Sequence, residues 1–140
     1  MNLENKSSES WEKIETDKTL VAKALQHAEK DLETAKNVFK TGDYDWCYSI
    51  AYNSMLSAGR ALMFNDSVRP KGEGKHVSVI DYLRYKYSKE FEEDLFLLNK
   101  MRKKRHLVVY EEVNIVSEEE SEFGIATAEK FIRKVKGIIN

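Results

Sequence analysis

Apolar residues that return every three or four positions are the feature of this sequence that most restricts its fold. Between Val21 and Phe39 they fall at 21, 25, 28, 32, 35 and 39, and the same spacing recurs in later segments. A stripe of this period is one face of an amphipathic helix. No segment alternates convincingly as a half-buried strand does, and the short run 107–109 is the one β-like triplet. We therefore expect an all-α protein.

Local signals divide the chain into about five helices. Gly42 and Asp43 suit a helix end followed by an N-cap, and a linker this short favours antiparallel neighbours. Ser117 and Glu120 match a capping box, and residues 65–75 contain the only proline and two glycines, which predicts a loop. The expected helices span about 21–39, 44–64, 76–87, 91–113 and 117–139.

Bulk properties predict a single domain over residues 1–140, with residues 1–9 polar and flexible. The composition is 41% hydrophobic and 34% charged, which suits a globular protein, and the net charge of -1 favours no class of partner. Cys47 is the only cysteine, so we expect a reducing compartment, no metal and no cofactor. The sequence has no membrane span and no signal peptide, so the expected location is the cytoplasm. It also has no DNA-specific motif, so DNA is not an expected partner.

The segment from Phe91 to Tyr110 carries the strongest functional signal. Its apolar stripe begins with Leu95 and Leu98, but the same spacing then places Arg102 and Arg105 where apolar residues were due. His106 and Tyr110 continue the row of Arg102 along a helix, since helical neighbours lie three and four residues apart. A guanidinium in such a place requires water, a carboxylate or a bound anion, because burying it unpaired is too costly.

This cluster has the groups that phosphate chemistry requires. Guanidinium groups bind phosphate through two hydrogen bonds, and an imidazole can exchange protons near neutral pH. We assign Arg105, His106 and Tyr110 as candidate catalytic residues for metal-free cleavage of RNA, with Arg102, Lys103, Arg60 and His76 as candidate phosphate or RNA ligands. The competing interpretation is a solvated basic face, with His76 bonded locally and Arg60 paired with a carboxylate.

The remaining polar and aromatic candidates have structural interpretations. Tyr44, Trp46, Tyr48 and Tyr52 are expected to pack between helices, although stacking on nucleic acid bases is the alternative. Asp43 and Asp45 fit the electrostatics of a helix N-terminus, and Cys47 fits the core.

With these residues in view, the chain resembles the HEPN domain family, whose name stands for higher eukaryotes and prokaryotes nucleotide-binding. The resemblance extends from about Leu20 to Ile139. It rests on the segments 42–46, 51–56, 58–62, Arg69-Pro70, Gly74-Lys75-His76, and 101–106 followed by Tyr110-Glu111.

That resemblance implies an up-down four-helix bundle with a short additional helix. It also implies a homodimer in which the family's diagnostic helix, the one that carries residues 101–106 and Tyr110 here, faces its copy in the partner. Active members are metal-independent endoribonucleases with an Arg-x4-6-His motif, and many are toxins encoded beside a minimal nucleotidyltransferase antitoxin. Mapped here, the motif arginine is Arg105 and its polar follower is His106, whereas the motif histidine falls on Tyr110. With this departure, either His106 takes over the proton transfer or the chain is an inactive version that binds RNA or a partner.

Three functional hypotheses follow. The first is a HEPN homodimer that binds RNA or nucleotide phosphate in an inter-subunit cleft, with ribonuclease activity and a nucleotidyltransferase antitoxin as partner. The second is a catalytically inactive module that docks an acidic protein partner through its arginines. The third is a structural bundle in which Arg102 and Arg105 pair with carboxylates of their own chain, such as Glu93 or Asp94.

Overall fold

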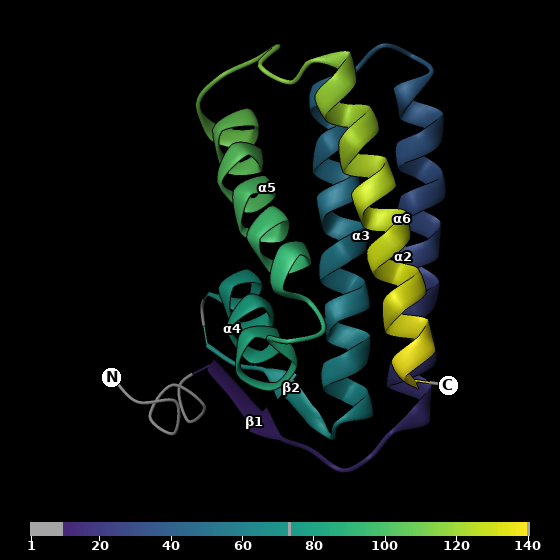
Figure 1. The fold of residues 1–140 in the computed structure, drawn as a ribbon, viewed down its shortest axis with the longest axis vertical. Coiled ribbons are helices and arrows are strands. Elements are labelled where there is room, and N and C mark those ends of the chain that lie inside the picture. The colour runs from purple at the N-terminus through teal and green to yellow at the C-terminus, as the bar shows by residue number, and fades with distance from the viewer. Residues whose placement is uncertain (1–9, 73, 140) are drawn as a thin grey trace.

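The computed structural model describes residues 10–72 and 74–139. Five helices follow one another in the order α2 (Lys18–Phe39), α3 (Tyr44–Asn65), α4 (Lys75–Tyr87), α5 (Glu92–Tyr110) and α6 (Glu118–Ile139) (Figure 1). Two three-residue strands, β1 (Trp11–Lys13) and β2 (Val68–Pro70), form an antiparallel pair. The segment 1–9, expected to be flexible, lies outside the described residues.

The helix termini follow the predicted signals. The carboxylate of Asp43 accepts the backbone N–H of Trp46 at the start of α3, 3.1 Å away. At the start of α6 the capping box is complete, because Glu120 N donates to Ser117 Oγ and Ser117 N donates to Glu120 Oε1. Gly42, which follows α2, adopts a φ of +84°, a conformation open to glycine and strained for other residues.

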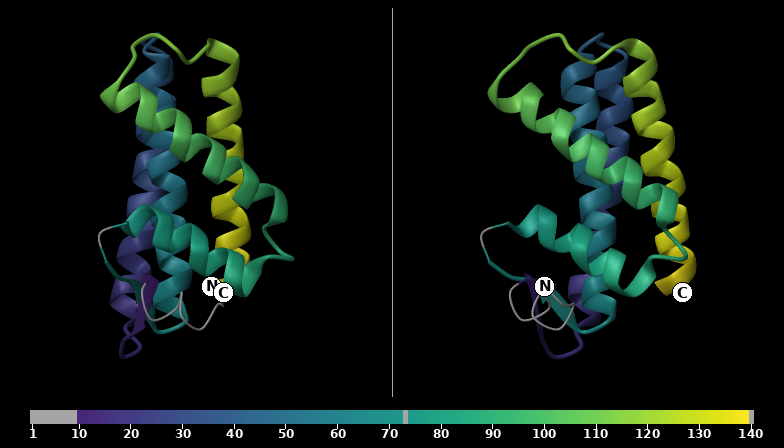
Figure 2. Two further views of the ribbon diagram at one scale, coloured as in Figure 1. Left: turned by 90° about the vertical axis from the view of Figure 1, so that its left-hand side faces the viewer. Right: turned by 60° about the vertical axis from the view of Figure 1, so that its left-hand side comes forward.

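Helix α3 is the centre of the bundle. It contacts each of the other four helices, and buried residues lie all around its circumference. Helices α2, α3 and α6 run side by side, whereas α5 crosses at an angle and the short α4 lies near one end of the bundle (Figures 1 and 2). The expected all-α bundle of four longer helices and one short helix is thus confirmed.

The strands differ from the prediction, which placed no strand in the chain. Trp11 pairs with Pro70 and Lys13 with Val68, so each strand is too short for an alternating pattern and requires a partner far away in sequence. Trp11 packs on the body of the protein, with its ring centroid 5.2 Å from that of Tyr82 and 5.4 Å from that of Tyr85. The β-like triplet 107–109 is helical.

Helix α5 ends at Tyr110, three residues before the expected Val113. Downstream, the backbone N–H groups of Asn114, Ile115 and Val116 all donate to the carboxylate of Asp45, at 2.5, 3.1 and 2.9 Å. Asp45 therefore has two roles: it favours the start of α3, and its carboxylate holds residues 114–116 of the connection between α5 and α6 in place. None of the described helices has the length and apolarity that crossing a lipid bilayer would require.

Candidate phosphate-binding pocket

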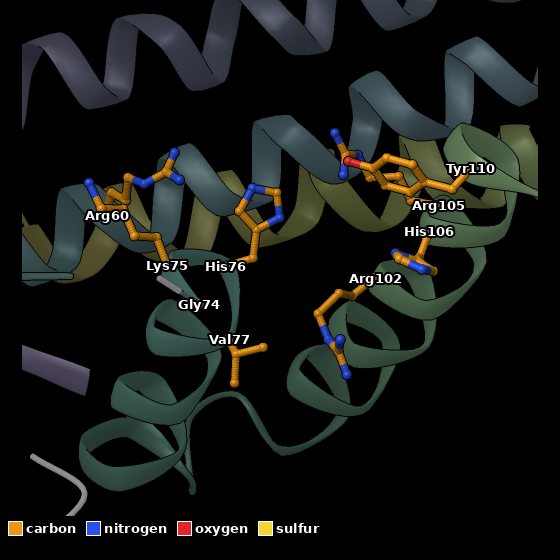
Figure 3. Close-up of a pocket in the computed structure, with 9 residues that line it drawn as sticks. All are labelled: Arg60, Gly74, Lys75, His76, Val77, Arg102, Arg105, His106 and Tyr110. Atoms are coloured by element: carbon orange, nitrogen blue, oxygen red, sulfur yellow. The ribbon is translucent and has the colours of Figure 1, made fainter. Parts of the chain in front are cut away.

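A pocket of about 500 Å³ lies between α3, α4 and α5, and it brings together residues that are far apart in sequence. Figure 3 shows the residues that line it, which come from these three helices. The lining residues are Arg60 from α3, Gly74, Lys75, His76 and Val77 from the start of α4, and Arg102, Arg105, His106 and Tyr110 from α5. Four of them carry a positive charge, and none of those described carries a carboxylate.

Helix α5 presents its two arginines through the apolar residues that precede them. Leu95, Leu98 and Met101 are buried, which fixes the rotation of the helix. Arg102 then turns toward Asn99, whose side-chain oxygen accepts hydrogen bonds from Nε and Nη2, both at 3.1 Å. The guanidinium carbon of Arg105 lies 5.7 Å from the centre of the Tyr52 ring. The two arginines of the apolar stripe are therefore held by different contacts.

Helices α3 and α4 complete the pocket. Arg60 is half-buried near the end of α3, and His76 lies in the first turn of α4, with its Nδ1 3.3 Å from the hydroxyl of Tyr52. Gly74 supplies no side-chain cap to α4, and no acidic residue lies in the first turn. The positive end of this helix therefore adds to the field of the arginines.

The electrostatics of the pocket favour an anion. Burial lowers the pKa of His76, and Arg105, Arg60 and Arg102 lower that pKa further, so the imidazole is neutral at neutral pH. Burial also raises the pKa of Tyr52 to about 12, against the opposing effect of the same arginines, so its phenol keeps its proton. A phosphate group would supply the negative charge that these side chains lack.

The other predicted site residues lie at the rim of the pocket or outside it. His106 and Tyr110 are exposed, with ring centroids 4.9 Å apart. The structure gathers Arg105, His106, Tyr110, Arg102, Arg60 and His76 around one pocket. Lys103 is exposed and is not among the residues that line it.

The carboxylate pairing of the third hypothesis is not observed. Asp94 binds Lys134 of α6 at 2.7 Å. Within residues 10–72 and 74–139, neither arginine of the stripe forms an ion pair with a carboxylate. A structural role in ion pairing thus gains no support from the described contacts.

The cysteine and the aromatic residues of α3 are not among the residues that line the pocket. Cys47 is fully buried, and burial raises the pKa of its thiol to about 11. Tyr48 and Tyr52 pack inside the bundle as expected, whereas Trp46 is half exposed. The part of the chain that the structure describes contains no cluster of His, Cys, Asp and Glu suited to a metal ion.

Sequence reasoning missed three contributors to the pocket. Lys75 lines it, Asn99 holds Arg102, and Tyr52 contacts both His76 and Arg105. Asn99 lies three residues before Arg102, so helical spacing contained the signal for that contact. The contacts of Tyr52 depend on how three helices pack, for which the sequence offers no local signal.

The protein is an all-helical bundle in which α5 presents two arginines to a pocket. Comparison with known proteins identifies the family to which such a bundle belongs. The HEPN domain model matches residues 21–138, so the chain belongs to the HEPN family. It is 28% identical over 117 residues to the Methanocaldococcus jannaschii protein named "Putative toxin MJ0142", covering 81% of this chain and 78% of that protein.

A solved structure supports the same fold. The crystal structure of ST0689, described as an archaeal HEPN homologue, superposes with a TM-score of 0.68 at 21% identity. The match covers 86% of this chain and 98% of the other chain.

Proposed function

We propose that this HEPN protein binds RNA or nucleotide phosphate in the pocket between α3, α4 and α5 and acts in a toxin-like role. The observation that carries this proposal is the convergence of Arg60, Arg102 and Arg105 from two helices on one space, without a carboxylate among the described lining residues. Unpaired cations held close together repel one another, and a bound phosphate would relieve that repulsion. The match to a protein named as a toxin agrees with such a role.

The reaction that fits this pocket is cleavage of RNA through its own 2′-hydroxyl. The 2′-oxygen would attack the adjacent phosphorus as its proton leaves, and the departing 5′-oxygen would take up a proton, which yields a 2′,3′-cyclic phosphate. Arginine guanidinium groups would stabilise the charge that develops on phosphorus. His106, at the exposed rim beside Tyr110, would exchange the protons.

The proposal includes a homodimer and an antitoxin partner. The last two turns of α5 expose apolar side chains beside the pocket, so pairing of two α5 helices would bring two pockets together. Each protomer contains a full set of arginines, so we propose that a phosphate binds within one chain and that a longer RNA extends across two. A minimal nucleotidyltransferase is the antitoxin that we propose.

The test is RNA binding and cleavage by the purified protein in the presence of EDTA. We expect Arg105→Ala to weaken binding of a short single-stranded RNA at least about tenfold, since a charged phosphate contact contributes roughly 1.5–3 kcal/mol. His106→Ala should bind RNA as the wild type does and cleave it slowly. Equal binding by the wild type and Arg105→Ala would contradict the proposal. Equal cleavage by the wild type, Arg105→Ala and His106→Ala would show that these residues do not catalyse the cleavage.

The alternative is a catalytically inactive module that docks an acidic protein segment on the same arginines. The exposed position of Tyr110, where the family motif has histidine, favours it. A docking module would bind RNA without the steep salt dependence of phosphate contacts, or not at all, and would co-purify with its partner.

A further inference from the structure

Tyr52 is a fully buried tyrosine at the centre of α3 that contacts two of the pocket's functional side chains without being part of the lining. Its hydroxyl lies 3.3 Å from Nδ1 of His76 on α4. Its ring lies beneath the guanidinium of Arg105 on α5, 5.7 Å from the guanidinium carbon. One side chain thus connects the contributions of α4 and α5 to the pocket.

The hydrogen bond determines which nitrogen of His76 carries the proton. Buried hydroxyl groups donate to a partner wherever one is in reach. Among the described residues, Nδ1 of His76 is the hydrogen-bond partner of the Tyr52 hydroxyl. With the phenol as the donor, Nδ1 accepts and the proton of the neutral imidazole lies on Nε2. His76 consequently offers Nε2–H, a hydrogen-bond donor, to an anion in the pocket.

The ring of Tyr52 supports Arg105 in a second way. Nε of Arg105 is buried and has no hydrogen-bond partner in the described part of the chain. Arg102 instead has Asn99 to hold it. The negative face of the tyrosine ring attracts the cation and offsets part of the cost of its burial. This contact holds the guanidinium at the pocket that His76 also lines.

We infer that Tyr52 is the positioning residue of the phosphate site: its hydroxyl fixes His76 as an Nε2–H donor, while its ring holds Arg105 beside that donor. This inference rests on the proposed phosphate binding. His76 is then a neutral donor to the anion, and proton exchange is left to the groups at the rim.

The experiment compares Tyr52→Phe, His76→Ala and the double variant in binding a fluorescent single-stranded RNA of about 12 nucleotides in EDTA. Tyr52→Phe keeps the ring beneath Arg105 and removes only the hydroxyl, so it should weaken binding by about threefold to tenfold. The double variant should bind within about twofold of His76→Ala, because the hydroxyl acts through His76.

Tyr82→Phe is the matched control. Its buried hydroxyl donates to Asp66 at 2.8 Å, away from the pocket, so the variant loses a similar hydrogen bond and should retain wild-type affinity. If Tyr52→Phe binds like Tyr82→Phe, or if the effects of Tyr52→Phe and His76→Ala multiply in the double variant, the inference is wrong.

A spectroscopic measurement tests the inference separately from RNA binding. Nitrogen-15 NMR of the imidazole above its titration should show the proton of His76 on Nε2 and the lone pair on Nδ1. Tyr52→Phe should shift the Nδ1 resonance, since its hydrogen-bond donor is gone, while Tyr82→Phe should leave it in place. A proton on Nδ1 would overturn the assignment even if RNA binds. If the wild type does not bind RNA, the proposed function is wrong. The NMR result would still decide the role of the Tyr52 hydroxyl.

Discussion

Arg102 is the residue whose position in the pocket depends most directly on a neighbour in its own helix. Asn99 accepts two hydrogen bonds from its guanidinium and leaves one terminal nitrogen, Nη1, for a ligand. We expect Asn99→Ala to weaken RNA binding by about threefold, because the freed arginine loses side-chain entropy on binding. Fluorescence anisotropy at constant salt measures the change.

Asn99→Asp provides the contrasting variant. A carboxylate at that position would pair with Arg102 and compete with phosphate, so the loss of affinity should exceed that of Asn99→Ala. The order wild type, Asn99→Ala, Asn99→Asp is the expected series. Equal affinities for all three proteins would show that the contact does not position the arginine.

His76 should make the stability of the protein depend on pH. Its pKa is lowered in the folded state by burial and by Arg105, Arg60 and Arg102, and Lys75 also lines the pocket. The unfolded chain therefore binds a proton more readily, near the ordinary pKa of about 6.5, so this contribution is present above that pH and is lost as pH falls toward the folded pKa. Urea unfolding at about pH 7 and about pH 5 should show a smaller loss of stability for His76→Ala than for the wild type, and an equal loss would contradict the assigned pKa direction.

At the scale of helices, the approach of α4 to α3 depends on Gly59. A Cβ built there would lie 2.6 Å from Cγ1 of Val79 and 3.2 Å from Cδ1 of Leu83, two buried side chains of α4. Gly59→Ala should therefore lower the free energy of unfolding by about 1–3 kcal/mol through overpacking. Because α4 carries His76, the displaced helix should also weaken RNA binding.

Gly137→Ala is the matched control on α6. A Cβ at that position meets nothing within 4 Å, so the substitution should stabilise the helix by up to about 1 kcal/mol and leave RNA binding unchanged. Thermal unfolding compares the two variants. If Gly59→Ala were as stable as Gly137→Ala, close packing would not be the reason for the glycine.

Asp45 acts on a different pair of elements, α3 and the connection that follows α5. Removal of its carboxylate leaves the N–H groups of residues 114–116 without their acceptor. We expect Asp45→Ala to cost about 1–3 kcal/mol of stability and to speed amide hydrogen exchange at those three positions. Unchanged exchange there would show that other contacts fix the connection.

Helices were predictable from the sequence because their signals are local. The stripe from Val21 to Phe39, the cap at Asp43 and the capping box at Ser117 each involve residues within a few turns, and the structure shows all three. The strand pair required contacts between residues 55–59 positions apart, which no local pattern contains.

Several residues of the pocket were predictable from the sequence, whereas their arrangement was not. Arg102 and Arg105 stood out because they continue an apolar stripe, and unpaired guanidinium groups are too costly to bury there. That Arg60 and His76 would join them depends on how α3, α4 and α5 pack, so a solvated face stayed an equally valid alternative. Tyr52 was predicted only to pack between helices, because its two polar contacts exist only once those helices meet.

At the scale of the whole molecule, the exposed apolar side chains after Arg105 predict where two copies meet. Val109 and Tyr110 at the end of α5 are 42% and 69% exposed, and Val113 beyond it is 78% exposed. Exposed apolar side chains close together in sequence favour association, since burying them removes apolar area from water. Sedimentation should therefore show a wild-type dimer and a monomeric Val109→Glu, Val113→Glu double variant, with Ile138→Glu on α6, which is 38% exposed, as the control that stays dimeric.

The wild-type dimer and the monomeric double variant should also differ in how they bind RNA. Each protomer has its own arginines and Tyr52, so the monomeric variant should bind a mononucleotide as the wild type does. It should bind a longer RNA several-fold more weakly, because a strand that reaches two pockets gains from the high effective concentration of the second. A monomer that loses mononucleotide binding as well would mean that the partner subunit completes the phosphate site, and that α5 pairing precedes binding.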